Sequence, residues 1–430
     1  MKPHLIAMAA SLLTTLSATP SFVQTRGMDL VRNGKKYTFM GANLWYGMNL
    51  GAFDRPRLKR ELDRLQRLGI ENLRILAASE GPDSERWRIV PALQTAPGVY
   101  NQKLLEGLDY LLAEMAKRDM TAVLVLGNYW HWSGGFGQYQ AWAGKGAIPY
   151  PEFDPEARCG SDYKLSSWWR WFRYNYYVTR FYKNPVAVGF YHNTVRMLVT
   201  RVNHVTRRAY KDDPTIMAWQ LANEPAGFLS GDSYDKWIAE SAALIKSLDR
   251  NHLVSTGAMG EVFQFSGNDQ VKNHSHKDID YTTVHIWVQN SGLYSPWKAS
   301  ETYAKAVEVL HKQLAQHREL AKKLNKPLVF EEFGFSRDLN RFTAGTPVTL
   351  RDDFYAQAFY HVMESQKTDS PIAGVNFWAW GGEGRPARVQ WQPGDNFIGD
   401  PPHEAQGWYS IYDTDATTLK LIREVAGRLK

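Results

Sequence analysis

At two places in this chain, glutamates stand at the end of an apolar run, where a carboxylic acid could take part in catalysis. Glu224 stands after Asn223 in "WQLANEPAG", and Glu331 and Glu332 stand together in "LVFEEFG". Two carboxylic acids on separate elements suit cleavage of a glycosidic bond. One acid protonates the leaving oxygen, and the other attacks the anomeric carbon or activates a water. Carboxyl groups about 5–5.5 Å apart would indicate a retaining reaction.

Other apolar runs end in residues suited to a neutral ligand rich in hydroxyl groups. Asn223 can hydrogen-bond a sugar hydroxyl, and the Arg74 guanidinium can keep a neighbouring carboxylate ionised. Indole rings stack on the apolar faces of pyranose rings. The remaining candidates at the ends of these runs are Trp130, His285, Trp287 and Trp378.

Several other chemistries lack their motifs. The chain has no Gly-x-Ser-x-Gly turn and no phosphate-binding Gly-rich loop, and its one cysteine, Cys159, cannot form an intrachain disulfide. The polar stretch "NHSHKDID" (273–280) lacks a His-x-x-x-His spacing on a helix, so we expect no metal and no cofactor. A single Glu at the end of a strand is more often a salt-bridged or solvated residue. The combination of positions therefore carries the hypothesis.

The candidate residues need a scaffold that brings their elements together. Eight short apolar runs alternate with amphipathic stretches, and runs without polar alternation are typical of parallel strands buried on both faces. This order predicts a (β/α)8 TIM barrel with long loops on its C-terminal face, where such barrels build their sites. A doubly wound sheet is the alternative, but no strand precedes a Gly-rich phosphate turn. The predicted strands lie in 36–45, 71–78, 121–128, 215–223, 252–258, 280–287, 326–334 and 372–380. The amphipathic stretches predicted as helices include residues 195–210.

Composition and charge limit the partners. Apolar residues make up 44% of the 430 residues, which allows a large core, and the net charge of +7 comes from interleaved basic and acidic residues. We therefore expect no nucleic-acid partner and no membrane span. The basic, then apolar, then small-residue pattern of residues 1–20 predicts a signal peptide and a secreted or periplasmic protein. Residues 21–430 are predicted to form a single catalytic domain, and a monomer.

Several stretches resemble glycoside hydrolase family 5, in particular its endo-β-1,4-mannanases. "WQLANEP" resembles the acid/base motif of the fourth strand, and "VFEEFG" resembles the nucleophile motif of the seventh. Further collinear stretches are "GGFGQYQAWAG", "DYTTVHIWVQN", "NFWAWGGEGRP" and "WQPGDNFIGDPPHEAQGWYSIYDTD". The resemblance covers nearly everything after residue 25.

The resemblance implies roles for individual residues. Glu224 would be the acid/base, and Glu332, which precedes Phe333-Gly334, would be the nucleophile. Glu331 is the competitor, but consecutive strand residues point to opposite faces. Arg74, Asn223, His285 and Trp378 match family site positions, whereas Trp130 and Tyr129 both remain possible on the third strand. Gln220 stands where these mannanases often carry an acid, and we expect it to point away from the site.

The predicted function is that of a retaining endo-β-1,4-mannanase. It would hydrolyse internal bonds of mannan, glucomannan or galactomannan by a two-glutamate double displacement. An endo-β-1,4-glucanase or an exo-β-mannosidase on the same scaffold is the alternative. A non-catalytic carbohydrate-binding protein is a more distant alternative, and the presence of both Glu224 and Glu332 argues against it.

Overall fold

The computed structural model describes residues 21–151, 168–261 and 266–429. Residues 1–20 of the predicted signal peptide and Cys159 therefore lie outside the described residues. Eight parallel strands form one sheet, in the order β10-β9-β8-β5-β4-β13-β12-β11. They are β4 (Phe39–Asn43), β5 (Asn72–Leu76), β8 (Thr121–Val125), β9 (Ile216–Gln220), β10 (Leu253–Ser255), β11 (Thr282–Ile286), β12 (Leu328–Phe333) and β13 (Ile372–Phe377).

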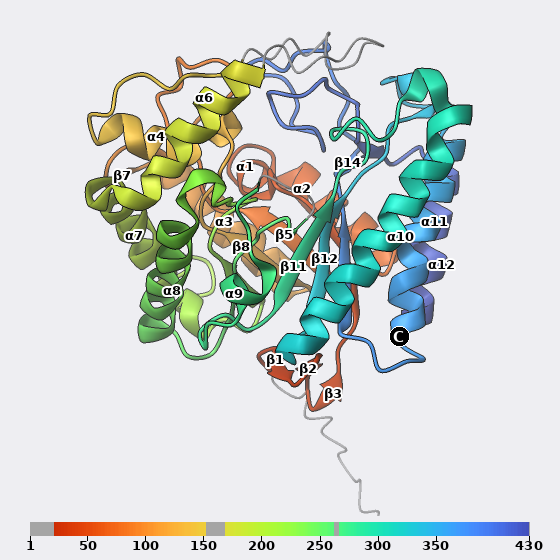
Figure 1. The fold of residues 1–430 in the computed structure, drawn as a ribbon, viewed down its shortest axis with the longest axis horizontal. Coiled ribbons are helices and arrows are strands. Elements are labelled where there is room, and N and C mark those ends of the chain that lie inside the picture. Colours follow the sequence, from red (N-terminus) through yellow and green to blue (C-terminus); the bar gives the residue numbers. More distant parts are fainter. Residues whose placement is uncertain (1–20, 152–167, 262–265, 430) are drawn as a thin grey trace, which may run out of the picture.

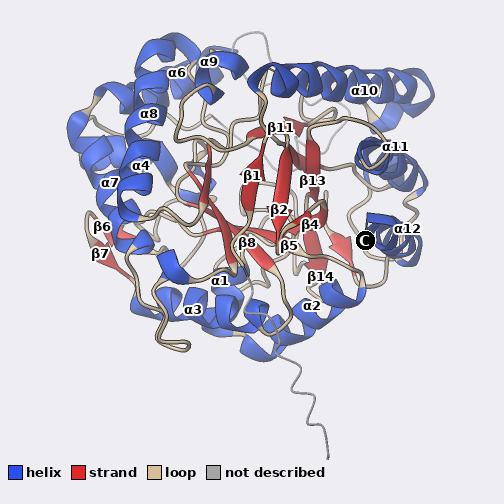
Figure 2. Cartoon of the chain, turned by 90° about the horizontal axis from the view of Figure 1, so that it is seen from below, coloured by secondary structure: helices blue, strands red, loops and turns tan. Residues whose placement is uncertain are grey.

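The two end strands of this order also meet. The backbone N–H of Asp280, just before β11, donates to the carbonyl of Val254 in β10 at 2.8 Å. Above that point, the Thr283 hydroxyl donates to the carbonyl of Ala258 at 2.6 Å. With helices ringed around the strands (Figures 1 and 2), the chain forms the predicted (β/α)8 TIM barrel.

Five of the outer helices lie on predicted amphipathic stretches, over 55–67, 102–116, 231–248, 299–324 and 349–365. Side chains cap several of them: Asp54 accepts from the N–H of Arg57 at 3.1 Å, and Asn101 accepts from that of Lys103 at 3.1 Å. None of the described helices is long and apolar enough to cross a membrane. The helices outside the β8–β9 connection are α1 (Gly47–Phe53), α2 (Arg55–Arg67), α3 (Gln102–Ala116), α8 (Gly231–Leu248), α9 (Gln270–His274), α10 (Ala299–Leu324), α11 (Thr349–Ser365) and α12 (Ala416–Leu429).

The connection from β8 to β9 differs from its prediction. It contains α4 (Gly135–Trp142), α6 (Trp168–Thr179) and α7 (Pro185–Val199). The sequence pattern predicted a helix over 195–210, but α7 ends at Val199. Asn203 explains part of the difference, because its side-chain oxygen accepts from the N–H groups of Val205 and Thr206 and holds a turn there.

A small sheet that the sequence did not predict covers the lower end of the barrel (Figures 1 and 2). It consists of β1 (Gln24–Arg26), β2 (Asp29–Arg32) and β3 (Lys35–Lys36), paired antiparallel. Leu30 of β2 is fully buried against side chains from the bottom of the barrel, among them Met217 and Val329. This end of the barrel is therefore sealed by an apolar plug.

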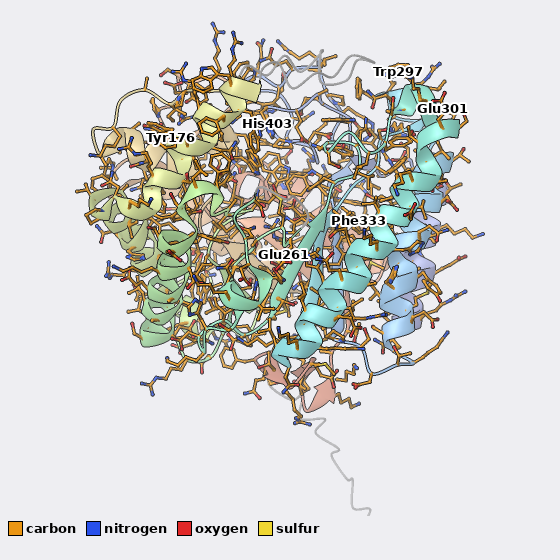
Figure 3. The ribbon with its side chains drawn as sticks, in the orientation of Figure 1. Tyr176, Glu261, Trp297, Glu301, Phe333 and His403 are labelled. Carbon is orange, nitrogen blue, oxygen red and sulfur yellow. The ribbon has the colours of Figure 1, made fainter. Side chains whose placement is uncertain are left out.

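The opposite end carries the long loops. Residues 383–410 run over the upper face in Figure 1, between β14 (Trp380–Gly382) and β15 (Ile411–Tyr412). A further hairpin, β6 (Gln94–Ala96) and β7 (Val99–Tyr100), lies in the β5–α3 connection. Figure 3 places His403 of the long loop on the same upper side as Trp297 and Glu301, at the start of α10. This face is the C-terminal face of the barrel.

Candidate active site

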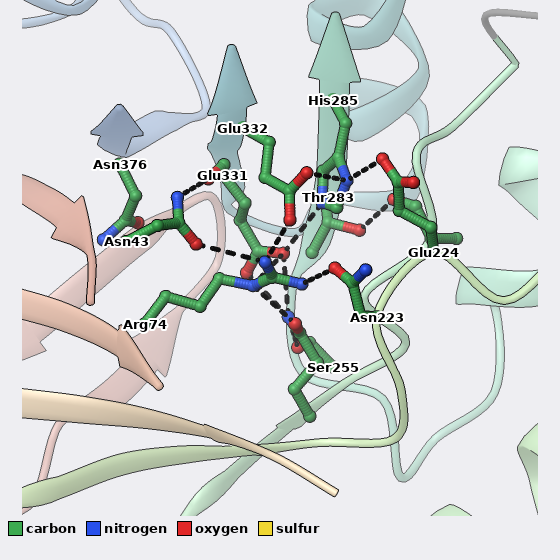
Figure 4. A network of polar contacts seen from close by, with 12 residues as sticks. Asn43, Arg74, Asn223, Glu224, Ser255, Thr283, His285, Glu331, Glu332 and Asn376 are labelled. Atoms are coloured by element: carbon green, nitrogen blue, oxygen red, sulfur yellow. Dashed lines mark hydrogen bonds and ion pairs between the residues drawn. The ribbon is translucent and has the colours of Figure 1, made fainter. Parts of the chain in front are cut away.

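Strand register brings the predicted polar residues together at the carboxyl ends of the strands. Asn43 of β4 is paired with Arg74 of β5, and His285 of β11 is paired with Glu332 of β12. Asn223 reaches the same level just after β9. Figure 4 shows these side chains converging around Arg74. Since they come from five separate strands, only barrel closure places them in one site.

Glu224 sits at the mouth of the fourth barrel strand, and its backbone has a φ of 51°. This left-handed conformation costs a non-glycine residue about 1 kcal/mol or more, and the N–H of Glu224 offsets part of that by donating to Gly257 at 2.9 Å. The carboxylate accepts from Trp130 Nε1 at 2.6 Å and from Trp287 Nε1 at 3.2 Å. His285 Nδ1 lies 2.9 Å away. Hydrogen bonds therefore fix the orientation of both carboxylate oxygens of Glu224.

Glu332 contacts the Trp287 indole and is almost completely buried. Arg74 Nη1 donates to one oxygen, and Trp287 Nε1 donates to the other at 3.3 Å. Burial alone would raise the pKa of this carboxyl, but the charges of His285 and Arg74 and their hydrogen bonds lower it below its usual value. Glu332 is thus kept ionised.

His285 lies between the two carboxylates. Its Nδ1 is 2.9 Å from Glu224 and 3.4 Å from Glu332. Burial alone would lower the pKa of this imidazole, but the negative charge of Glu332 and hydrogen bonds to Glu224, Glu331 and Glu332 raise it well above the usual value. One carboxylate oxygen of Glu224, one ring nitrogen of His285 and one carboxylate oxygen of Glu332 all lie within 4.8 Å of one another.

This cluster has three groups that could in principle hold a metal ion. The positive guanidinium of Arg74 already contacts Glu332, and the raised pKa of His285 keeps the imidazole protonated. A histidine that binds a metal ion must be neutral. The contacts therefore fit two carboxylates held by N–H donors better than a cation site.

The structure corrects the reason for choosing Glu332 over Glu331. Strict alternation would place the two side chains on opposite faces of β12. Instead, the pairing of β11 with β12 shifts register between Val284 and His285, and Glu331 is passed over. Glu331 also contacts His285, with Nε2 at 3.5 Å, and lies 3.8 Å from Arg74 Nε. The two carboxylates therefore lie on the same side, and only Glu332 also contacts Trp287.

The prediction for Gln220 is wrong. Its side chain is fully buried inside the barrel and does not point away from the site. Gln220 Oε1 accepts from Arg74 Nε at 2.7 Å, and its Nε2 donates to both oxygens of Glu331 at 2.9 and 2.7 Å. This residue is part of the network beneath the two glutamates.

The geometry also decides between Trp130 and Tyr129. Trp130 Nε1 donates to Glu224, whereas the buried Tyr129 hydroxyl donates to Asn175 of α6 at 2.5 Å. Tyr174 of the same helix lies parallel to Trp130, with ring centroids 6.2 Å apart. The α6 segment thus supports the indole that hydrogen-bonds Glu224.

Trp378 and Trp287 form an aromatic wall of the site, with ring planes at 83° and centroids 5.9 Å apart. A pocket opens beside them. Sequence reasoning missed Asn43, although it ends an apolar run as the other candidates do. The side chains that line the pocket are Asn43, Trp45, Arg74, Leu76, Val125, Trp132, Asn223 and Trp378.

Comparison with known proteins agrees with this geometry. A family model described as "GH family 5 beta-mannosidase-like" matches residues 20–430. The chain belongs to glycoside hydrolase family 5. The chain is therefore a glycoside hydrolase, as the sequence predicted.

Three proteins similar to this chain differ in their degree of similarity to it. Mannan endo-1,4-beta-mannosidase 4 of Solanum lycopersicum is 30% identical over 382 residues, which cover 85% of this chain and 84% of that protein. The solved family 5 mannosidase of Rhizomucor miehei is 37% identical with a TM-score of 0.85, covering 95% of this chain and 97% of that one. The endo-beta-1,4-mannanase of Thermotoga petrophila is 25% identical with a TM-score of 0.67, covering 92% and 78%.

Proposed function

We propose that this family 5 enzyme hydrolyses β-1,4-mannosidic bonds of neutral mannan or its oligosaccharides with retention of configuration. The observation that carries the mechanism is the spacing of the two glutamates, whose nearest oxygens lie within 4.8 Å. Retaining enzymes have carboxyl groups about 5–5.5 Å apart, whereas inverting enzymes need about 6.5–9.5 Å to admit a water.

In the first step Glu332 attacks the anomeric carbon and Glu224 protonates the leaving oxygen. The C1–O bond breaks, and a glycosyl ester on Glu332 forms. In the second step Glu224 takes a proton from water, which attacks C1 and releases Glu332. His285 Nδ1 can pass a proton to Glu224 along their hydrogen bond before the first step, and can take it back after the second.

The substrate class rests on similarity and on the aromatic lining. The curated relative from Solanum lycopersicum is named for mannan, and a variant of the Rhizomucor miehei mannosidase was solved with mannosyl-fructose. Trp45, Trp132 and Trp378 offer ring surfaces to pyranose rings. Export to the medium or the periplasm, predicted from residues 1–20, is part of the proposal, and fractionation of the expressing cells tests it.

The sequence predicts endo action, and the named mannan endo-1,4-beta-mannosidase supports it. Exo action is a second candidate, which two observations favour. The solved mannosidase is more similar to this chain than the solved endo-mannanase from Thermotoga petrophila. The loop over 383–410 also packs on two tryptophans of the pocket, with Phe397 on Trp45 and His403 on Trp132. A loop that closes that side of the pocket would favour binding of the end of a mannan chain over binding of its interior.

One panel tests these statements. The parent, Glu224→Ala and Glu332→Ala are incubated with mannan, carboxymethylcellulose and manno-oligosaccharides. We expect release of reducing ends from mannan by the parent alone, with the β-anomer formed first by NMR. Mixed oligosaccharides would indicate endo action, and mannose as the sole early product would indicate exo action. Cleavage by Glu332→Ala at the parent rate, or binding of mannan without cleavage by the parent, would contradict the proposal.

A further inference from the structure

We propose that Gln220 is a positioning residue for this reaction. Its amide joins Arg74 to Glu331 without adding a proton that titrates, and so leaves the charge of Arg74 to Glu332. The inference rests on the proposed role of Glu332 as the nucleophile, and it assigns a role to a position that the sequence motif alone leaves without one.

The orientation of the Gln220 amide is fixed by its neighbours. Arg74 Nε can only donate, so the oxygen of Gln220 must face it, at 2.7 Å. The nitrogen then faces Glu331 at 2.9 and 2.7 Å, and Ser255 Oγ at 3.0 Å. Since an amide carries both a donor group and an acceptor, one side chain satisfies a cation on one side and an anion on the other.

The remaining donors of Arg74 show what this arrangement preserves. Nη1 donates to Glu332 and, at 3.2 Å, to Asn43, while Nη2 donates to Asn223 at 2.8 Å. Glu332 is therefore the carboxylate that Arg74 hydrogen-bonds, and Glu331 lies farther off, 3.8 Å from Nε. A carboxylate at position 220 would take the Nε donor and divide the positive charge between two anions.

A glutamate at position 220 would also introduce a proton. Its second oxygen would take the place of Gln220 Nε2, at hydrogen-bond distance from Glu331. Two buried carboxylates at that distance do not readily ionise together. They therefore share one proton between them. The titratable and charged groups that face this pair are Arg74 from β5, Tyr281 before β11, His285 from β11, and Glu332 from β12.

The first variant is Gln220→Glu, which keeps the shape of the side chain. We expect it to cleave mannan with the acid limb of kcat/KM shifted to higher pH by about half a unit or more, because Arg74 lowers the pKa of Glu332 less. Its melting temperature should fall below that of the parent progressively as pH rises from 5 to 9. The folded variant binds the shared proton more tightly than the unfolded chain does, so loss of this proton at higher pH lowers stability.

The second variant exchanges the two groups, as Gln220→Glu with Glu331→Gln. The total charge then equals that of the parent, and no proton is shared between the pair. We expect the acid limb to stay shifted, because the carboxylate introduced at position 220 still takes the Arg74 donor, while the pH-dependent difference in melting temperature disappears. This variant also serves if Gln220→Glu does not fold.

The matched control is Gln138→Glu, since Gln138 also accepts from a buried arginine, Arg88, at 2.8 Å, but neither residue contacts Glu224 or Glu332. We expect its acid limb to match the parent. An unshifted acid limb in both Gln220 variants, with a parallel melting-temperature profile for Gln220→Glu, would overturn the inference while the proposed function stands. If the parent does not cleave mannan, the proposed function fails, and the melting-temperature profiles still decide whether Gln220 excludes a shared proton.

Discussion

Arg74 and His285 are cations that contact the carboxylates of this site. Arg74 reaches Glu332, Gln220, Asn43 and Asn223 from one planar group. No single amine could reproduce these directions, because a lysine offers a compact ammonium in place of a planar set of five donors. The planar fork of Arg74 is therefore the feature that organises the floor of the site.

Arg74→Lys tests this organisation. Because the pKa of Glu332 is lowered by His285 and Arg74 in the folded enzyme, weaker contact with the cation raises it, and the acid limb of kcat/KM moves to higher pH. We expect kcat/KM at neutral pH to fall at least about tenfold, equivalent to about 1.4 kcal/mol of transition-state stabilisation. An unchanged acid limb would show that Arg74 does not control the ionisation of Glu332.

Variants of Trp130 and Tyr129 form a matched pair that tests the hydrogen bond to Glu224. Trp130→Phe keeps a ring against Tyr174 but removes the N–H that holds Glu224, so we expect kcat/KM to fall about tenfold. Tyr129→Phe removes only the hydroxyl that donates to Asn175, and kcat/KM should stay within about twofold. Equal losses in both variants would assign the effect to packing of α6 and not to the hydrogen bond.

Glu80 joins the segment after β5 to helix α4. It lies after β5, fully buried, and accepts from the N–H of Gly135 at 2.8 Å and from the Tyr139 hydroxyl at 3.0 Å, both from α4. Burial raises its pKa to about 7. The unfolded chain loses this proton near the ordinary value of 4.5, so the folded state is favoured fully below pH 4.5 and loses that advantage as pH rises through about 7.

Glu80→Gln removes this loss, because the amide oxygen can accept from the Gly135 N–H and the amide nitrogen can donate to the Tyr139 hydroxyl oxygen, with no proton that titrates. We expect the variant to melt at a higher temperature than the parent above pH 7, by an equivalent of at most about 3 kcal/mol, and the difference to shrink below pH 4.5. The exposed Glu301→Gln serves as control and should leave the pH profile of melting unchanged. A difference that does not vary with pH would contradict the assignment.

The barrel as a whole separates stability from chemistry at its two ends. The sheet of β1, β2 and β3 seals the bottom (Figure 1), while the side chains of the candidate site lie at the carboxyl ends of the strands. A defect in the plug should therefore weaken folding without altering the site, since conserving the catalytic geometry requires only that the upper ends of the strands stay in place.

Leu30→Ala tests this separation. Leu30 is fully buried in the plug, so we expect the free energy of unfolding to fall by about 2–5 kcal/mol. The values of kcat and KM, measured well below the melting temperature, should stay within about twofold of the parent. Val99→Ala, at an exposed position far from the plug, is the control for truncation. A loss of kcat in Leu30→Ala under folded conditions would mean that the two ends are coupled.

Much of the architecture could be predicted from the chain alone. Continuous apolar runs and intervening amphipathic stretches mark the eight strands and most helices, because both patterns follow from burial on two faces or on one. The helix expected over 195–210 and the missed sheet of β1 to β3 show the limit. Asn203 holds a local side-chain turn inside the range expected to be helical, and the short strands of the plug carry too few residues to show a period.

The sequence by itself determined which residue types stand at the ends of the strands, and these include Arg74, Asn223, Glu224, His285 and Glu332. Only the tertiary structure decided which neighbours share a face. The register shift beside Glu331 overturned the expectation drawn from strand alternation, and the inward side chain of Gln220 overturned the expectation that it points away from the site. The physical reason is that side-chain direction near a bulge or a strand end depends on pairing with another strand, and pairing exists only once the barrel has closed.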